Sequence, residues 1–251
     1  MRLTEYMKVY QIAEIIEKIA PLEQAEEWDN IGLLVGDKNK EVKKLLVALD
    51  INSEILKQAV ELCVDMIVVH HPLIFKPINR INDSILLSLI QNDIAVYAAH
   101  TNLDNSEIGV NSVLADVLLL QNVSREGMLA IGEINETSAF DFIAFVKEQL
   151  KVEAVRVSNY ELNKKIKKVA VLGGNGGDFV QQVAQNGCDA FVTGEASYHN
   201  AQLAYENDLL LISAGHFETE NPVVDMLTQY LTDNTDAEII KAQPFNVYIS
   251  I

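Results

Sequence analysis

The histidines of this chain are few, and they occupy positions typical of ligand binding. Each of them lies at or just beyond the end of an apolar run that predicts a strand; they are His70, His71, His100, His199 and His216. In open α/β sheets, ligands bind beyond the carboxyl ends of the strands. Imidazoles at such an edge favour metal binding or acid–base chemistry.

The strongest local motif is DMIVVHHPLIF, residues 65–75. It predicts a buried strand followed by two adjacent imidazoles, with Pro72 ending the strand. Neighbouring residues of an extended chain point to opposite sides, so His70 and His71 would diverge unless the backbone turns or two ions are bound. The pair therefore suits a dinuclear metal centre. A histidine pair alone is more often a capping or core feature, and this alternative stays open.

Two further motifs place an acid four residues after a histidine. HTNLD runs from His100 to Asp104, and GHFETE contains His216 and Glu220. If a helix begins directly after the strand, side chains four residues apart meet on one face. Carboxylates can bridge two cations while imidazoles fill terminal positions, a mixture that zinc, manganese and iron accept. Alone, this spacing usually marks a solvated helix start, whereas its recurrence in an internal repeat favours metal binding.

The internal repeat has an offset of 124 residues. Residues 42–69 align without a gap to residues 166–193, and each copy predicts a strand, a turn, an amphipathic helix and a second strand. Further along, residues 96–104 align with residues 212–220, which places the two histidine–acid motifs opposite each other. Continuously apolar strands in such βαβ units predict a sheet covered on both faces.

We therefore expect a duplicated α/β domain with mixed or parallel sheets covered by helices, and a metal site in the cleft between the two halves. The halves would be residues 1–125 and 126–251. Helices are expected at residues 9–19, 110–120, 140–150 and 223–231. Thr137 and Ser138 are available to cap the third of these. The last segment, PFNVYISI, is expected to be a strand that joins the sheet of one half, with the first half as one candidate.

Composition narrows the function. The net charge of −17 argues against general nucleic-acid binding, because a phosphate backbone would be repelled. The N-terminus lacks the layout of a signal peptide, and no apolar run reaches the length of a membrane span, so we expect a soluble, cytoplasmic protein without membrane contact. Cys63 and Cys188 are too few for a disulfide framework and are expected as buried thiols in a reducing compartment.

Charged and amide side chains near the HHP motif allow two interpretations. Asp29 and Asn30, in WDNIGLLVGD, would line the metal cleft or orient a ligand histidine, and turn chemistry is an equal alternative. Lys76 and Arg80 would meet an anionic substrate, although such residues are more often simply solvated.

In the second copy, GGNGGD (residues 173–178) follows a strand but lacks the spacing of a dinucleotide or P-loop fingerprint. A tight turn is favoured over anion binding there. GEASYHN occupies the place of the HHP motif and offers Glu195 and His199 as acid or base groups, with packing as the alternative.

Six motifs in this order resemble the NIF-three-like family, whose members are often labelled GTP cyclohydrolase 1 type 2 homologues. These motifs are WDNIGLLVGD, VVHHPLIF, AAHTNLDN, GGNGGD, DAFVTGEASYHN and GHFETE. The likeness runs from about Trp28 to Glu220 and is to the short form of the family, without an inserted domain.

The resemblance implies a duplicated α/β fold, a dinuclear metal site and a toroidal homohexamer built from dimers. It also implies a ligand set for two divalent ions per chain, which would be zinc, iron or manganese. That set is His70, His71, Asp104, His216 and Glu220. His100 would lie beside the metals.

The leading functional hypothesis is a metal-dependent hydrolase resembling GTP cyclohydrolase 1 type 2 and acting on a small molecule, either a nucleotide or a phosphoester. His100 and Glu195 are the candidates for proton transfer. The alternative is a non-catalytic metal-binding scaffold or regulatory protein. A structural metal site is closed by protein ligands, whereas a catalytic site keeps an open position.

Overall fold

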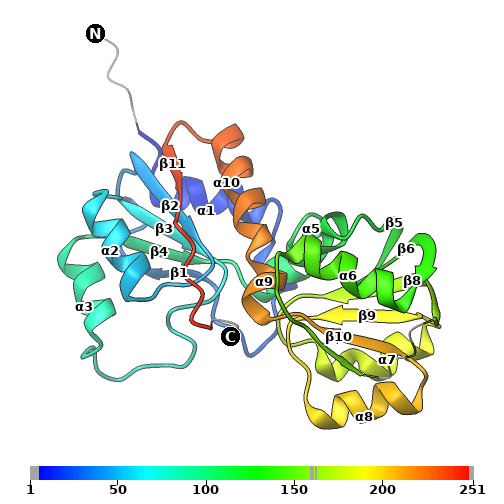
Figure 1. The fold of residues 1–251 in the computed structure, drawn as a ribbon. Helices are drawn as coiled ribbons and strands as arrows, with labels where there is room; N and C mark the ends of the chain where they lie inside the picture. Colours follow the sequence, from blue (N-terminus) through cyan, green and yellow to red (C-terminus); the bar gives the residue numbers. More distant parts are fainter. Residues whose placement is uncertain (1–5, 159–160, 162, 249–251) are drawn as a thin grey trace. The chain divides into compact units, whose positions relative to one another are not determined.

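The computed structural model describes residues 6–158, 161 and 163–248, which form two compact units. Of the described residues, the first unit contains those up to Gly109 and Val224–Val247, and the second contains those between Val110 and Val223 together with Tyr248. Each unit is built on its own sheet with helices on both faces (Figure 1). None of the helices described is long and apolar enough to cross a membrane.

The first unit contains a five-stranded sheet in the order β1-β4-β3-β2-β11. Its strands are β1 (Gly32–Val35), β2 (Lys44–Ala48), β3 (Met66–Val69), β4 (Ala95–Ala98) and β11 (Glu238–Lys241). Four strands are parallel, and β1 pairs antiparallel with β4 at the edge. The carboxyl ends of β2, β3 and β4 therefore lie along one edge of this sheet.

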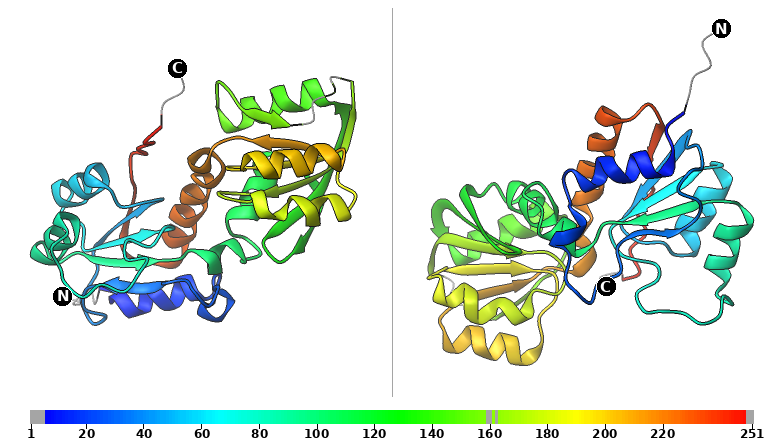
Figure 2. Two further views of the ribbon diagram at one scale, coloured as in Figure 1. Left: turned by 90° about the horizontal axis from the view of Figure 1, so that it is seen from below. Right: turned by 180° about the vertical axis from the view of Figure 1, so that it is seen from behind.

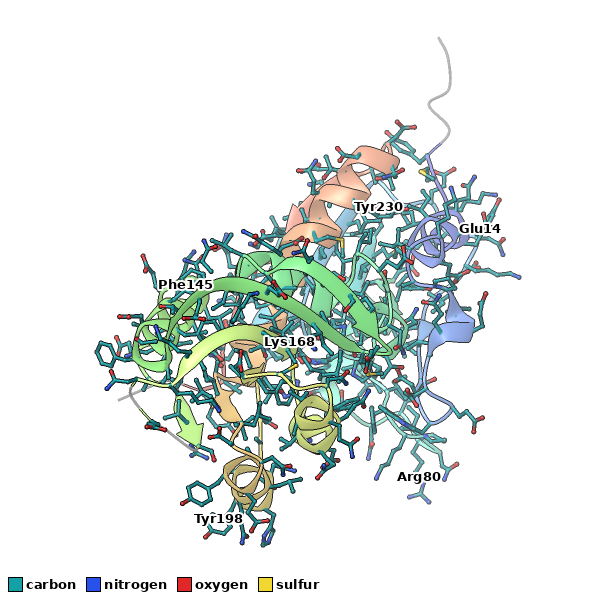
Figure 3. All side chains as sticks on the ribbon, turned by 90° about the vertical axis from the view of Figure 1, so that its right-hand side faces the viewer. Glu14, Arg80, Phe145, Lys168, Tyr198 and Tyr230 are labelled. Atoms are coloured by element: carbon teal, nitrogen blue, oxygen red, sulfur yellow. The ribbon has the colours of Figure 1, made fainter. Side chains whose placement is uncertain are left out.

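Helices cover both faces of the first sheet (Figure 2). They are α1 (Val9–Glu17), η1 (Leu22–Gln24), α2 (Ser53–Glu61), α3 (Ser84–Gln91), α4 (Thr101–Asp104) and α10 (Pro222–Asn234). Helices α2 and α3 pack on the side chains of Leu46, Ile67 and Val96, which share one face. On the other face the Tyr97 hydroxyl donates to Glu17 of α1. Tyr230 of α10 reaches the same helix through a hydrogen bond to a backbone carbonyl (Figure 3).

The second unit contains a six-stranded sheet in the order β5-β6-β8-β9-β10-β7. Its strands are β5 (Gln121–Glu126), β6 (Leu129–Ser138), β7 (Arg156–Ser158), β8 (Lys165–Leu172), β9 (Ala190–Thr193) and β10 (Leu210–Ser213). β8, β9 and β10 are parallel, and the other three strands are antiparallel to their neighbours. The sheets are thus mixed, with a parallel core in each, as the sequence predicts.

Alternate residues of the second sheet point to its two faces, and each face is covered by a layer of helices. The helices are α5 (Val110–Val117), α6 (Ala139–Leu150), η2 (Gly177–Phe179), α7 (Val180–Gln185), α8 (Tyr198–Glu206) and α9 (His216–Glu220). Val169 and Val171 of β8 pack with residues of α5 and α6, whereas Ala170 and Leu172 pack with residues of α7 and α8. This alternation explains why these strands are apolar at nearly every position.

The duplication is visible in matching polar contacts. The Asp65 carboxylate accepts the backbone N–H groups of Lys43 and Lys44 at 2.7 and 3.0 Å. Its counterpart Asp189 accepts the two equivalent N–H groups of the second copy at 2.9 and 2.8 Å. In both units this carboxylate ties the start of one parallel strand to the start of the next.

A lysine contact is repeated in the same way. The Lys40 ammonium group donates to the backbone carbonyl of Asp93, and the Lys164 ammonium group donates to that of Asp208. Each aspartate lies just after a helix and has a left-handed φ of 53° or 52°. The two units therefore end equivalent helices, α3 and α8, with the same side-chain cap.

The compact units differ from the expected division into residues 1–125 and 126–251. Helix α5 packs in the second unit, and β5 pairs there with β6. In the other direction the chain from Val224 returns to the first unit, where β11 pairs in parallel with β2. The exchange covers the edge of β2, which would otherwise expose unpaired backbone groups.

The expected strand in PFNVYISI is wrong for its described part, Pro244–Tyr248, which has no strand structure. Its last three residues lie outside the described residues. The strand that returns to the first sheet is β11, just before this segment. After β11, the backbone N–H of Gln243 donates to the side chain of Gln58 and not to a neighbouring strand. Pro244 has no N–H to donate.

The expected helices are present, as α1, α5, α6 and α10. Ser138 caps α6, because its hydroxyl accepts the Asp141 N–H at 3.1 Å. Thr137 belongs to β6, where it pairs with Ile166.

The expectation of two buried thiols is correct for Cys188 and wrong for Cys63, which is exposed. Cys63 follows α2 with a left-handed φ of 53°. Its counterpart in the second copy is Gly187, with a φ of 66°. This position turns the chain out of the helix, so a side chain here points to solvent rather than into the core.

We expect Asp65→Ala and Asp189→Ala each to lower the free energy of unfolding by about 1–2 kcal/mol, because each leaves two backbone donors without their charged acceptor. Urea unfolding followed by circular dichroism measures this. Asp116→Ala, an exposed aspartate on α5, is the control and should change stability by less than about 0.5 kcal/mol. Equal effects at all three positions would contradict this reading of the duplicated contact.

The two thiols should differ in reactivity toward iodoacetamide. Burial raises the pKa of the Cys188 thiol to about 11, so its reactive thiolate stays scarce at mildly alkaline pH. Mass spectrometry of the native protein should therefore find Cys63 labelled first. Both thiols should be labelled in denaturant, and similar labelling rates in the native protein would refute the prediction.

Candidate metal centre

The carboxyl end of β3 delivers two histidines. His70 is fully buried, and its Nδ1 lies 2.9 Å from the backbone carbonyl oxygen of Ala99, next to the end of β4. The Nδ1 of His71 lies 2.6 Å from the carboxylate of Asp50, next to the end of β2. Carbonyl and carboxylate oxygens accept hydrogen bonds, so each Nδ1 carries the proton and each Nε2 carries the lone pair that a metal ion needs.

A third histidine is held in the same way. The His100 Nδ1–H donates to Asp29 Oδ1 at 2.9 Å. Asp29 Oδ2 accepts both the backbone N–H and the hydroxyl of Thr101, at 3.0 and 2.6 Å. Burial by itself would raise the pKa of Asp29, but the hydrogen bonds from His100 and Thr101 outweigh it and lower the pKa to about 2. Asp29 is therefore a carboxylate that orients His100.

These three imidazoles form one cluster. The His70 ring centroid lies 4.8 Å from that of His71 and 5.1 Å from that of His100. One ligand nitrogen from each ring falls within 4.8 Å of the others. Helix α4 then places Asp104 Oδ1 3.7 Å from His70 Nε2. The adjacent histidines thus converge, because the chain leaves the extended conformation at His70.

The second unit carries a smaller group at the corresponding strand end. Helix α9 begins at His216, three residues after the end of β10, and the His216 Nε2 lies 3.0 Å from Glu220 Oε2. The His216 Nδ1 lies 3.6 Å from Glu195 Oε1. Glu220 is buried, with only 5% of its surface exposed. A histidine and an acid four residues apart therefore do meet on one helical turn, as the spacing predicts.

The GGNGGD segment supports this group as a tight turn. A Cβ at Gly174 would lie 2.1 Å from Glu220 Oε1, so only glycine allows the backbone to approach this carboxylate. The Gly174 N–H donates to Thr219 Oγ1, and the Gly176 N–H donates to Thr193 Oγ1. These two backbone donors are used inside the protein, which supports the tight turn.

The structure places most of the predicted site residues in these two groups. His70, His71, His100 and Asp104 belong to the first unit, and Glu195, His216 and Glu220 belong to the second. His199 lies on α8 beside Tyr198, outside the metal-binding groups found among the described residues. A common site that draws ligands from both halves stays a prediction.

Sequence reasoning missed Asp50. Its position was informative, because it follows the end of β2 just as the histidines follow the ends of β3 and β4. In the repeat it aligns with Gly174, and His71 aligns with Glu195. At this position the first copy has Asp50, which holds His71, whereas the second copy has Gly174, which leaves room for the Glu220 side chain.

The match to known proteins covers nearly the whole chain. A family model described as Duf34/NIF3 (NGG1p interacting factor 3) matches residues 7–245. This chain belongs to the Duf34/NIF3 family. The NIF3-family resemblance found in the sequence motifs is confirmed.

Individual relatives agree with this assignment. A Clostridium perfringens protein named GTP cyclohydrolase 1 type 2 homolog is 35% identical over 248 residues, which cover 93% of this chain and 94% of that protein. A Methanocaldococcus jannaschii protein of the same name is 36% identical, covering 93% and 98% of the two chains. The crystal structure of a Bacillus cereus protein related to NIF3 superposes with a TM-score of 0.92 at 25% identity, covering 99% of this chain and all of that one. The duplicated, helix-covered α/β fold is thus that of NIF3-family structures.

We expect Asp29→Ala to lower the free energy of unfolding by about 1–3 kcal/mol, because His100 and Thr101 lose a buried charged acceptor. The matched variant is Asp50→Ala, whose more exposed carboxylate anchors His71 and should cost less than about 1 kcal/mol. Urea unfolding of both variants measures the difference. An unchanged free energy of unfolding in Asp29→Ala would show that Asp29 does not hold this segment in place.

Proposed function

We propose that this chain is a dinuclear-metal-dependent hydrolase resembling GTP cyclohydrolase 1 type 2, acting on a nucleotide or a phosphoester. The observation that carries the proposal is the anchoring of His70 and His71 at Nδ1 by Ala99 and Asp50, with His100 held beside them by Asp29. Metal-ligating histidines are typically held by such an acceptor, which fixes the tautomer and the ring orientation. Histidines that only pack in a core would not require three such hydrogen bonds at one edge of a sheet.

The donor set fits divalent transition metals. We assign two ions per chain, zinc, iron or manganese, to imidazole and carboxylate ligands, a mixture that all three accept. These ligands would be His70, His71, Asp104, His216 and Glu220. A buried carboxylate such as Glu220 is stabilised by nearby positive charge, which a divalent ion supplies.

Bound divalent ions would polarise the substrate and activate water for attack. The protein's own residues would move the protons. His100 can take a proton at Nε2, and Asp29, hydrogen-bonded at Nδ1, would stabilise the resulting imidazolium. Glu195 is the second candidate, because its carboxylate lies 3.6 Å from His216 Nδ1 and is half exposed.

The names of the relatives support a nucleotide as substrate, and the net charge of −17 supports a small ligand over a polyanion. Two divalent ions would make the site locally positive, so a small anion could bind although the surface as a whole repels it. We further propose a cytoplasmic location and a toroidal homohexamer.

The burial of His70 and Glu220 favours a second candidate, a non-catalytic metal-binding scaffold or regulatory protein. Structural sites are closed by protein ligands, whereas catalytic sites keep an open position. The side chains of His71 and His216 are 23% and 36% exposed, which favours the open, catalytic alternative.

Elemental analysis of protein purified without chelator should find about two equivalents of transition metal per chain. A His70→Ala, His71→Ala double variant should lose metal, because it removes two imidazole ligands. His199→Ala is the matched control and should retain it, since His199 lies outside the cluster. Metal-replete protein should hydrolyse GTP or another nucleotide or phosphoester, and the double variant should be at least about 100-fold slower.

The outcomes separate the two candidates. Metal binding without turnover of any nucleotide or phosphoester would favour the scaffold. Fewer than about one equivalent of metal in the wild-type protein would contradict the metal centre itself.

A further inference from the structure

Two large aromatic rings lie exposed beside the histidine cluster. Trp28, the only tryptophan of the chain, is 58% exposed, and Phe75 is 48% exposed. Their ring centroids are 5.6 Å apart and their planes meet at 50°, so neither ring is stacked on the other. We call this pair the aromatic platform. Exposed aromatic rings gathered in one place typically mark a binding surface.

The backbone on each side of the platform is held firmly. Asp29, next to Trp28, is fixed by His100 and Thr101. Asn30 donates from Nδ2 to the carbonyl oxygen of Ile74, next to Phe75, at 2.5 Å. The backbone beside both rings is therefore held in place, which lowers the entropic cost of binding a ligand there.

The platform adjoins the imidazoles within the same unit. The Trp28 ring centroid lies 6.1 Å from that of His100, with the two planes at 75°. His100 lies 5.1 Å from His70 and 5.7 Å from His71, centroid to centroid. A planar molecule on the platform would thus have its other end within reach of the proposed metal ligands.

Two basic residues follow Phe75 in the same exposed segment. Lys76 is its direct neighbour, and Arg80 extends into solvent (Figure 3). Neither forms an ion pair with any residue that the structure describes. Unpaired cations in a chain of net charge −17 favour an anionic ligand at this place.

We propose that the aromatic platform stacks the base of a nucleotide, with its phosphate toward Lys76, Arg80 and the metal centre. This inference rests on the proposed function and names the residues that would select its substrate. Every nucleobase presents a flat face, so stacking on one of these rings, with edge contact to the other, would give affinity for an aromatic ring with little preference among bases. Loss of one ring should weaken binding about tenfold.

The fluorescence of Trp28 provides a direct test, because no other tryptophan contributes to the signal. Guanosine 5′-monophosphate, added to metal-replete protein, should quench it saturably. Ribose 5-phosphate carries the same phosphate without a base and should bind at least about tenfold more weakly. Excitation at the red edge of tryptophan absorption avoids light loss to the base.

Phe75→Leu keeps an apolar side chain but removes the ring, and should weaken guanosine 5′-monophosphate binding about tenfold with unchanged metal content. The control is Phe140→Leu, because Phe140 is 58% exposed on α6 in the other unit and should leave binding unchanged. Trp28→Leu, measured by calorimetry, should resemble Phe75→Leu.

Three results would overturn the proposed stacking. They are equal affinity for guanosine 5′-monophosphate and ribose 5-phosphate, absence of saturable quenching, and wild-type nucleotide affinity in Phe75→Leu. A changed oligomeric state of Phe75→Leu with unchanged nucleotide affinity would instead assign these rings to contact between copies of the chain, which also overturns it. Nucleotide binding and metal content are measured independently of each other. A failed platform with intact metal binding leaves the hydrolase proposal standing, and nucleotide stacking without metal would refute only the metal centre.

Discussion

The hydrogen bond from His70 Nδ1 to the carbonyl oxygen of Ala99 is the contact on which the candidate site depends most. It joins the residue after β3 to the residue after β4, so it exists only in the register that pairs Val69 with Ala98. A slip of one residue would turn the alternating side chains to the other face of the sheet. The apolar residues of the core, by fixing this register, also fix which nitrogen His70 presents.

The segment Trp28–Asn30 also positions residues of the site, and it connects the histidine cluster to the protein surface. Its three side chains have three different surroundings: Trp28 is exposed, Asp29 is buried against Thr101, and Asn30 holds the carbonyl of Ile74. One short stretch of chain therefore orients His100 and holds the segment after the histidine pair. It also sets an aromatic ring beside the cluster. This coupling explains how residues outside helices and strands can be held in place at the site.

Much of the fold and of the candidate site could be predicted from sequence because the repeat constrains both. Continuous apolar runs predicted the parallel strands, and the polar residues just beyond them predicted which edge carries the chemistry. Asp50 was missed because an acid after a strand is common, and only its distance to His71 shows what it does. The sequence left open which sheet the C-terminal part of the chain joins, since the choice of edge strand for β11 depends on long-range pairing.

The two copies show how one scaffold supports different side chains at equivalent strand ends. His70 of the first copy aligns with Gly194 of the second, where a Cβ would lie 2.6 Å from the carbonyl oxygen of Gly174. Closer backbone packing in the second copy excludes an imidazole there and leaves His216 and Glu220 as its metal-type pair. The duplication thus preserved the framework contacts of Asp65 and Asp189 while the chemistry diverged.

The central claim is that anchoring at Nδ1 by Ala99 and Asp50 presents Nε2 of His70 and His71 to divalent ions. Anomalous diffraction from crystals of metal-replete protein, collected at the absorption edge of the bound metal, tests it most directly. The account predicts two peaks per chain, with Nε2 of His70 and of His71 each within bonding distance, about 2.0–2.2 Å, of one of them. Metal bound through Nδ1 of these rings, or no peak near them, would contradict it.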